Sequence, residues 1–354
     1  MMKIVLIVIV IVVIVAIGAG LYMWNSMQNP LYQPGMVRDG QNLRAPLTPP
    51  QQSSDDDFWQ VEPDIQLHHF AAGEGRNVLI IHGGPGQPYV ELWPGLNGLT
   101  DDYQFHFYDQ RGAGKSTRPI DVFESNNYYA NAKQLEATLG LSAQIADIER
   151  IRQILGEEKL IIIGHSFGAF QAALYASEFP EHVESLVLVA PAPMLLMPME
   201  VSGLFDTVET LLPEEMRADY QIWQENYFDF RNLFKRTDAE LVALNEEFAR
   251  YYLTATASEN LATPEIEGVN PGGWMVHAMY LSMGQKHDYR PAMDAVTAPV
   301  LIIHAVEDFQ TEEASRTYLE VFPDAQFEII EGAGHTVFYD QPEAFADIVG
   351  EFLP

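Results

Sequence analysis

The stretch Leu160–Gly168, LIIIGHSFG, joins an aliphatic run to a turn built around a serine. An apolar run of this kind is typical of a strand buried on both faces of a sheet. The segment that follows, AFQAALYASEF from Ala169, has the composition of a helix. Strand, tight turn and helix in this order form the setting in which G-x-S-x-G presents a reactive serine.

The turn itself selects small residues around Ser166. Gly164 and Gly168 lie two positions before and two positions after it. A turn sharp enough to lift the serine oxygen above the sheet leaves no room for larger neighbours, and it sets the N–H of Phe167 at the start of the helix. We therefore predict Ser166 as a nucleophile; the alternative is a tight turn that carries an incidental serine.

Similar aliphatic runs recur along the chain and alternate with segments of helical period. They begin at Val78 (VLIIHGG), Phe105 (FHFYD), Ser185 (SLVLVAP) and Val300 (VLIIHAVED). Between them, QIADIERIRQIL places Ile148, Ile151 and Leu155 on one helix face. The alternation predicts an α/β fold with a mostly parallel sheet flanked by helices.

One interval lacks such runs. Residues 193–290 are acidic, aromatic and helix-forming, as in EEMRADYQIWQENYFDFRNLF from Glu214. We predict a helical cap over 193–290, inserted between two parts of one core, 58–192 and 291–354. A cap in this place would roof a site at the carboxyl ends of the strands.

A serine hydroxyl is a weak nucleophile that needs a base, and the base needs an acid to orient it. In this architecture both follow the serine along the chain. Asp308 comes directly after VLIIHAVE, and His335 follows FEII in the loop EGAGH. The predicted catalytic set is therefore Ser166, Asp308 and His335, with Glu307 as the alternative acid.

A glycine-rich loop, HGGPG, follows the run that begins at Val78. Its residues are His82, Gly83, Gly84, Pro85 and Gly86. In a serine hydrolase such a loop supplies one half of an oxyanion hole, and the residue after the nucleophile supplies the other half. The backbone N–H groups of Gly84 and Phe167 are the predicted donors; a plain Gly-Pro turn is the alternative.

The stretch DQRGAGKST, residues 109–117, ends like a phosphate-binding loop. That motif requires glycine five positions before Gly114, where this chain has Asp109. We predict a turn at a strand end and no nucleotide site. The chain has no cysteine and no H-E-x-x-H, so neither a metal nor a cofactor is predicted.

The net charge of the chain restricts the classes of partner that it is expected to bind. The chain carries 50 acidic and 19 basic residues, a net charge of −31. Nucleic-acid binding depends on basic contacts to phosphate, so this balance argues against it. A solvated acidic surface is the expected role of the excess charge, and attraction of cationic substrates is the alternative. The oligomeric state is left open.

The N-terminus predicts a membrane anchor. Residues 4–24 contain no charge and, as a helix, span roughly 30 Å, the thickness of a bilayer core. Residues 1–24 are predicted as a single-pass anchor in contact with lipid, with a cleaved signal segment or a buried helix as alternatives. Lys3 precedes the span and Arg38 is the next cation, which predicts an exported catalytic domain. Residues 25–57, rich in Pro, Gln, Asn and Ser, predict a flexible tether.

HGGPG, DQRGAGKS and the serine turn, in this order and spacing, resemble the proline iminopeptidase family of α/β-hydrolases from about Phe58 to Pro354. The resemblance implies that Ser166, Asp308 and His335 match the family's triad and that HGGPG lines its oxyanion hole. It implies that DQRGAGKS is a structural loop near the site. It also implies a helical cap, no metal or cofactor, and release of an N-terminal residue, often proline, from peptides.

The sequence departs from that family at two points. The serine turn is GHSFG where close members have G-G-S-W-G, and GHS-x-G is widespread among esterases and lactonases of this fold. The family's cap glutamates, which bind the substrate amino group, have no recognisable signature in this chain. The possible amine partners are Glu209, Glu214, Glu215, Glu225, Glu246 and Glu247.

The leading functional hypothesis is therefore a serine aminopeptidase acting on short peptides through an acyl-enzyme. One alternative is a hydrolase of small esters, lactones or amides. A second, of another class, is a non-catalytic, membrane-tethered binding protein.

Overall fold

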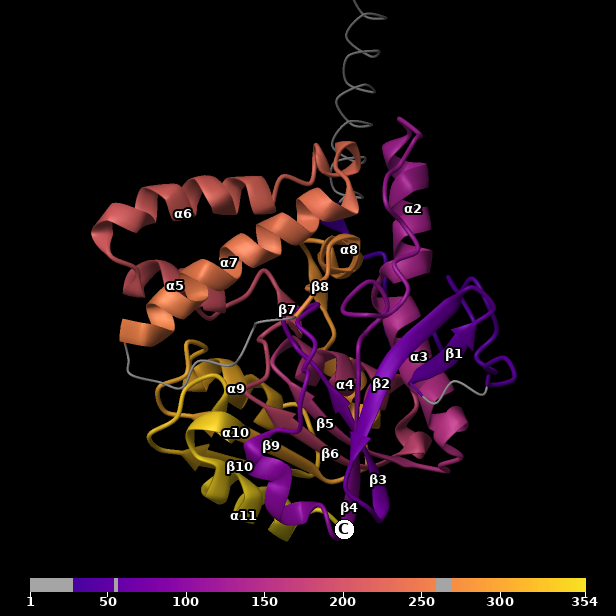
Figure 1. The fold of residues 1–354 in the computed structure, drawn as a ribbon, viewed down its shortest axis with the longest axis vertical. Coiled ribbons are helices and arrows are strands. Elements are labelled where there is room, and N and C mark those ends of the chain that lie inside the picture. Colours follow the sequence, from indigo (N-terminus) through magenta and orange to yellow (C-terminus); the bar gives the residue numbers. More distant parts are fainter. Residues whose placement is uncertain (1–27, 54–56, 259–268) are drawn as a thin grey trace, which may run out of the picture.

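The computed structural model describes residues 28–53, 57–258 and 269–354. Its centre is an eight-stranded sheet of order β1-β2-β4-β3-β5-β6-β9-β10 (Figure 1). The strands are β1 (Phe58–Glu62), β2 (Ile65–Ala72), β3 (Arg76–Ile81), β4 (Tyr103–Tyr108), β5 (Leu160–His165), β6 (Val183–Val189), β9 (Val300–Ala305) and β10 (Ala325–Ile330). β1 and β2 pair antiparallel at one edge, and the strands from β4 to β10 run parallel. The predicted α/β fold with a mostly parallel sheet is confirmed.

Helices cover both faces of the sheet, which explains why the central strands are apolar throughout. The covering helices are η1 (Pro94–Leu99), α3 (Leu141–Leu155), α4 (Phe167–Glu178), α9 (Glu312–Leu319), α10 (Val337–Asp340) and α11 (Pro342–Phe352). In β3, Leu79 and Ile81 belong to the same buried cluster as α3 and α4. Val78 and Ile80 point the other way, into a second cluster with η1 and α11. Successive strand residues therefore both need apolar side chains.

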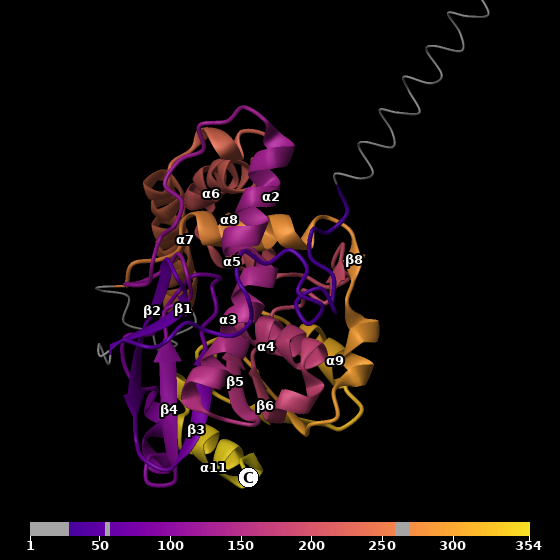
Figure 2. The same ribbon diagram turned by 90° about the vertical axis from the view of Figure 1, so that its right-hand side faces the viewer.

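Three helices of the predicted cap stand together at the end of the molecule opposite the C-terminus (Figures 1 and 2). They are α5 (Leu204–Leu211), α6 (Glu214–Tyr227) and α7 (Asp238–Ser258). Trp223 is their central side chain: its indole N–H donates to the Leu244 carbonyl at 2.9 Å, and its ring stacks on Phe248. Two short antiparallel strands, β7 (Leu196–Met197) and β8 (His287–Asp288), join the two ends of the insertion.

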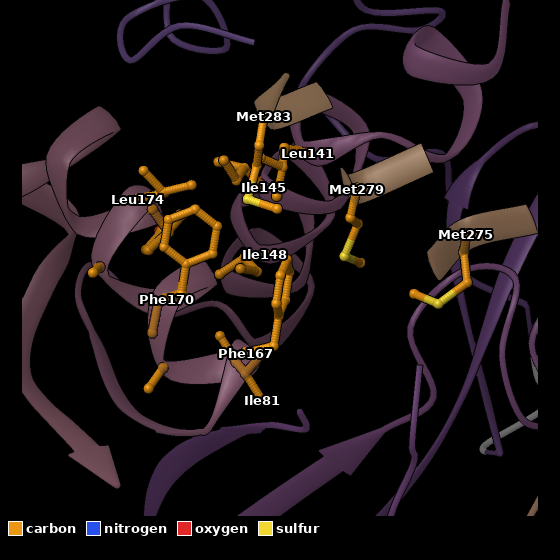
Figure 3. Packing of buried hydrophobic residues seen from close by; sticks show 14 of the residues in the cluster. Ile81, Leu141, Ile145, Ile148, Phe167, Phe170, Leu174, Met275, Met279 and Met283 are labelled. Carbon is orange, nitrogen blue, oxygen red and sulfur yellow. The ribbon is translucent and has the colours of Figure 1, made fainter. Parts of the chain in front are cut away.

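The fourth helix of that interval, α8 (Trp274–Met283), packs differently. It lies against α2 (Tyr128–Leu139) and α3 and shares the buried cluster of the sheet. Met275, Met279 and Met283, spaced by four residues, come from one side of α8 (Figure 3). Flexible methionine side chains suit this role, because they fill irregular gaps between helices.

The predicted tether, residues 25–57, is wrong for the part that the structure describes, residues 28–53. Tyr32 and Val37 are fully buried. The Tyr32 hydroxyl donates to the carboxylate of Glu178 at 3.0 Å, and the Val37 N–H donates to the same carboxylate at 3.3 Å. The segment forms turns over residues 34–42, and its few apolar side chains have a surface on α4 to bury against.

The predicted membrane location is corrected. Within residues 28–53, 57–258 and 269–354, no helix combines the length and the apolar character needed to cross a bilayer. The predicted span, residues 4–24, lies outside these described residues, as does the whole of the predicted anchor, residues 1–24.

Candidate active site

Ser166 lies in the tight turn between β5 and α4. Its φ of 56° and ψ of −120° are rare for a residue with a side chain. A Cβ on Gly168 would lie 2.2 Å from the carbonyl oxygen of Ile81, and one on Gly164 would lie 2.6 Å from the carbonyl oxygen of Gly168. Gly168 therefore allows α4 to begin this close to the end of β3, and Gly164 allows β5 to approach the first turn of α4.

The three side chains predicted to act together lie in hydrogen-bonding contact. His335, between β10 and α10, has its Nε2 at 2.9 Å from the Ser166 hydroxyl oxygen. Its Nδ1 lies 2.8 Å from Oδ1 of Asp308, which follows β9. The side chain of Asp308 is fully buried, and its Oδ1 also accepts the N–H of Gln310 at 2.9 Å. Glu307, the alternative acid, instead accepts the N–H of Ala333.

The HGGPG loop lies directly against the serine turn. A Cβ on Gly83 would lie 2.8 Å from the Cβ of Ser166 and 3.3 Å from the backbone nitrogen of Phe167. Gly84, at a φ of +111°, lines the same cavity as Ser166. Phe167 is the first residue of α4, so its N–H has no acceptor within the helix. The two predicted oxyanion donors thus belong to segments that meet beside the serine.

The DQRGAGKST loop is hydrogen-bonded to the HGGPG loop. The backbone N–H of Gln110 donates to Nε2 of His82 at 3.1 Å, and its side-chain amide donates to the His82 carbonyl at 2.9 Å. Burial lowers the pKa of His82 to about 4, so its ring is neutral and Nε2 can accept. Asp109 accepts the backbone N–H of Lys115 at 2.7 Å. These contacts give both motifs a structural role.

Sequence reasoning missed a second chain of hydrogen bonds, which runs through His165. Its Nε2 lies 2.7 Å from the backbone carbonyl oxygen of His335, and its Nδ1 lies 2.6 Å from the hydroxyl of Tyr89. A carbonyl only accepts, so Nε2 carries the proton and Nδ1 accepts from Tyr89. Burial holds the pKa of His165 well below its usual range, which keeps the ring neutral. The only sign of this contact in the sequence is that Tyr89 lies three residues after HGGPG.

A cavity of about 140 Å³ lies over Ser166, between the core loops and the cap. Ser166, His335, Gly84 and Tyr89 line it on the core side. The cap lines it with Leu204, Phe205, Tyr227, Asn245, Phe248 and Tyr252. The spacing of Phe248 and Tyr252, four residues apart on α7, is a signal that could have predicted an inward-facing pair. The other cap residues lie on different helices and carry no such signal.

The candidate amine partners on the cap do not line this cavity. Glu214, Glu215, Glu225, Glu246 and Glu247 are exposed. Glu209 is half-buried and accepts a hydrogen bond from the side chain of Gln221. Across the part of the chain that the structure describes, no group of three or more histidine, aspartate or glutamate residues could hold a metal ion.

The alpha/beta hydrolase fold model matches residues 76–342. The chain belongs to the alpha/beta hydrolase family. The matched range includes the serine turn, the cap and both candidate partners of Ser166, and this hydrolase is proline iminopeptidase-like in sequence.

The comparisons with individual proteins agree with this assignment. The chain is 26% identical to a proline iminopeptidase from Heyndrickxia coagulans over 293 residues, which cover 79% of this chain and 91% of the relative. Among solved structures it resembles a hydrolase from Pseudomonas aeruginosa, with a TM-score of 0.58, 17% identity, and coverage of 85% and 99%. It also resembles proline iminopeptidase from Mycobacterium smegmatis, with a TM-score of 0.53, 18% identity, and coverage of 82% and 95%. At these identities the structural likeness shows the fold alone.

Proposed function

We propose that this protein is a serine hydrolase that works through a covalent acyl-enzyme. The observation that supports the proposal is the unbroken hydrogen-bond chain from Ser166 through His335 to Asp308, which begins at the cavity. A hydroxyl, an imidazole and a buried carboxylate in this order activate a nucleophile on many unrelated folds.

In the first half-reaction, the Ser166 oxygen attacks the substrate carbonyl carbon while its proton passes to Nε2 of His335. The negative charge that develops on the carbonyl oxygen is stabilised by the N–H groups of Gly84 and Phe167. Asp308 keeps the imidazolium oriented through Nδ1. The bond to the leaving group then breaks, and His335 returns the proton to that group.

In the second half-reaction, a water molecule attacks the ester formed on Ser166. His335 takes a proton from this water as the oxygen bonds to the acyl carbon, and it returns the proton to the Ser166 oxygen as the acyl–serine bond breaks. The acid product leaves, and the free enzyme is restored without a metal or a cofactor.

A fluorophosphonate probe tests this proposal on the full chain. We expect covalent labelling of the wild-type protein at Ser166 and none in Ser166→Ala, measured by gel fluorescence and by mass spectrometry of the labelled peptide. Ser177→Ala, a buried serine on α4 away from the cavity, is the matched control and should label like the wild type. Absence of labelling in the folded wild-type protein would favour the non-catalytic binding protein.

The finer activity has two candidates. Aminopeptidase action on N-terminal proline is supported by the relatives named proline iminopeptidase, which match over most of their length. Hydrolysis of small esters or amides that are not peptides is supported by the cavity, because within the described residues none that lines it is charged. A panel of prolyl amides and 4-nitrophenyl esters compares the two.

A further inference from the structure

The HGGPG loop is held at both of its ends. At the first end, the carbonyl of His82 accepts the side-chain amide of Gln110, from the core, at 2.9 Å. At the other end, the carbonyl of Gly86 accepts the backbone N–H of Gly272, which lies between α7 and α8, at 2.8 Å. Gly84, a predicted oxyanion donor, lies between these two carbonyls. Both hydrogen bonds therefore restrain the direction in which its N–H points.

The contact at the Gly86 end is a close one. Gly86 has a φ of +79°, and a Cβ there would lie 3.0 Å from the Cα of Gly272, 2.6 Å from Sδ of Met275 and 2.9 Å from Cγ2 of Val276. The backbone of the loop thus packs directly on the start of α8. Any shift of Gly272 reaches the loop without a flexible side chain between them.

A side chain of the cap restrains Gly272. Gly272 is followed by Gly273, and two successive glycines leave the backbone unusually free. The Nδ2 amide of Asn245, on α7, donates to the carbonyl of Gly272 at 2.6 Å and to that of Leu241 at 3.2 Å. Asn245 is 4% exposed, so these hydrogen bonds are shielded from water and are stronger than at the surface.

The orientation of the Asn245 amide follows from its partners. The two carbonyls only accept hydrogen bonds, so the amide nitrogen faces them. The amide oxygen then faces the hydroxyl of Tyr227, on α6, which donates to it at 3.0 Å. Tyr227 and Asn245 both line the cavity over Ser166. One chain of contacts therefore runs from the cap wall of the cavity, through Gly272, to Gly86 of the HGGPG loop.

We propose that Asn245 is a positioning residue for the oxyanion hole: through Gly272 it holds the Gly86 end of the HGGPG loop and so aims the N–H of Gly84. This inference rests on the proposed serine-hydrolase function and adds a residue of the cap to it. The alignment of Gly84 then depends on the packing of α7, because Asn245 lies on that helix.

The variant Asn245→Leu tests the inference on the full chain, since leucine has nearly the same shape without the amide. Loss of a whole oxyanion donor typically lowers the rate by about 10²–10³-fold, and a donor that is only misdirected should cost less, about tenfold. We expect this fall in kcat on 4-nitrophenyl acetate and in the rate constant of fluorophosphonate labelling at Ser166, because both reactions place negative charge on an oxygen in the hole. KM should stay within about twofold, because the interaction is made in the transition state.

A thiono substrate separates a misaligned oxyanion hole from a loosened cap. Sulfur is larger than oxygen and accepts hydrogen bonds more weakly, so well-aimed N–H groups favour the carbonyl ester over its thiocarbonyl analogue. This preference is the ratio of kcat/KM for 4-nitrophenyl acetate to that for O-(4-nitrophenyl) thioacetate. We expect it to fall by about threefold or more in Asn245→Leu.

The matched control for this ratio is Trp223→Phe. It removes another buried hydrogen bond of α7, from the Trp223 indole to the carbonyl of Leu244, which does not involve Gly272. We expect it to lower the midpoint of thermal unfolding and to keep the wild-type ratio. A second test variant, Tyr227→Phe, keeps the ring and removes only the donor to Oδ1 of Asn245. Its ratio should fall in the same direction by a smaller factor, and this result decides the matter if Asn245→Leu does not fold.

A wild-type ratio in the folded test variant, or an equal fall in Trp223→Phe, would overturn the inference and leave the hydrolase proposal intact. If the wild-type protein is labelled at Ser166 but does not hydrolyse these esters, the labelling rate constants take the place of the ratio, and equal constants for the wild type and Asn245→Leu would overturn the inference. A wild-type protein that is neither labelled nor active would contradict the proposed function itself, and the inference with it.

Discussion

Asp308 and Glu307 are adjacent carboxylates with different partners. Asp308 contacts Nδ1 of His335, whereas Glu307 accepts the backbone N–H of Ala333. We expect Asp308→Asn to lower kcat by about 10⁴-fold, because an amide at this position favours the wrong tautomer of the imidazole. Glu307→Gln is the matched control and should keep kcat within a fewfold of the wild type. The steady-state rate on an ester substrate measures both, and the reverse ranking would assign the acid role to Glu307.

Tyr89 and His165 have a positioning role that the hydrogen bonds allow us to predict. In Tyr89→Phe the aromatic ring remains, but Nδ1 of His165 loses its hydrogen-bond donor. A buried acceptor without a donor costs about 1–3 kcal/mol. We expect kcat to fall by about tenfold, because His165 holds the backbone of His335.

The pH profile separates this positioning role from a general loss of stability. The donated hydrogen bond favours neutral His165, so its removal raises the pKa of that ring, and the loss of kcat in Tyr89→Phe should grow as the pH falls. Tyr339→Phe, another change in the cavity wall, is the control and should show no such trend. A uniform loss at every pH would contradict the positioning role.

At the scale of elements, the close contact between β3 and α4 depends on the absence of a side chain at Gly168. A Cβ on Gly168 would approach the carbonyl oxygens of Ile81 and His82 to 2.2 and 2.6 Å. Since backbone atoms cannot move aside as a flexible side chain can, we expect Gly168→Ala to destabilise the fold by about 1–3 kcal/mol and to abolish fluorophosphonate labelling. Thermal unfolding measures the first effect. Gly98→Ala, where nothing lies within 4 Å, should change neither.

The junction of α2, α3 and α8 contains a buried carboxyl, Glu136. It accepts hydrogen bonds from the hydroxyls of Ser142 and Ser282. Burial raises its pKa from 4.5 to about 7. The nearby phenols of Tyr32 and Tyr289 stay neutral in this range, because burial raises their pKa values.

This carboxyl predicts a loss of stability with rising pH. Below pH 4.5 the group is protonated in both the folded and the unfolded state. Between pH 4.5 and 7 the unfolded state ionises first, so roughly 3 kcal/mol of the free energy of unfolding is lost. Glu136→Gln should remove this component, which denaturant unfolding at pH 5, 6, 7 and 8 would measure. If the free energies of unfolding of the wild type and of Glu136→Gln changed equally with pH, the prediction would be contradicted.

At the scale of the whole molecule, the segment before β1 is part of the folded body. Besides the burial of Tyr32 and Val37, Arg150 of α3 donates to the carbonyls of Ala45 and Pro46 at 3.0 Å. A chain that begins at residue 58 exposes this surface. Each fully buried apolar side chain contributes about 1.5–3 kcal/mol, so we expect a lower midpoint of thermal unfolding than for a chain that begins at residue 28. Equal midpoints would show that the segment adds no stability.

The strands that could be predicted are those buried on both faces, such as β3, β5 and β9, because a short unbroken aliphatic run is typical of a strand covered by helices on both sides. β1, with the sequence FWQVE, lies at the sheet edge and alternates polar and apolar residues, so it was not predicted. α8 was assigned to the cap because helical sequence alone does not say which layer a helix joins.

The candidate site divides in the same way. Ser166, Asp308 and His335 follow strands whose carboxyl ends meet at one edge, so their proximity follows from chain order and from the parallel sheet. Gly164 and Gly168 could be predicted to lie in tight surroundings from the sequence alone, because only glycine fits at these two positions of the serine turn. The hydrogen bonds through Tyr89 and His165 left no comparable pattern, and the aromatic cap wall left only the four-residue spacing of Phe248 and Tyr252.

The sequence by itself determined the α/β sheet, the serine turn and the order of its partners, because each depends on local spacing and on runs of apolar residues. The tertiary structure alone decided that Phe205, Tyr227 and Phe248 of the cap line the cavity over Ser166, that His165 joins Tyr89 to the backbone of His335, and that the segment containing Tyr32 packs on α4. The physical reason is that a cap helix carries both glutamates and aromatic rings, and only its packing against the core selects which of them face the substrate.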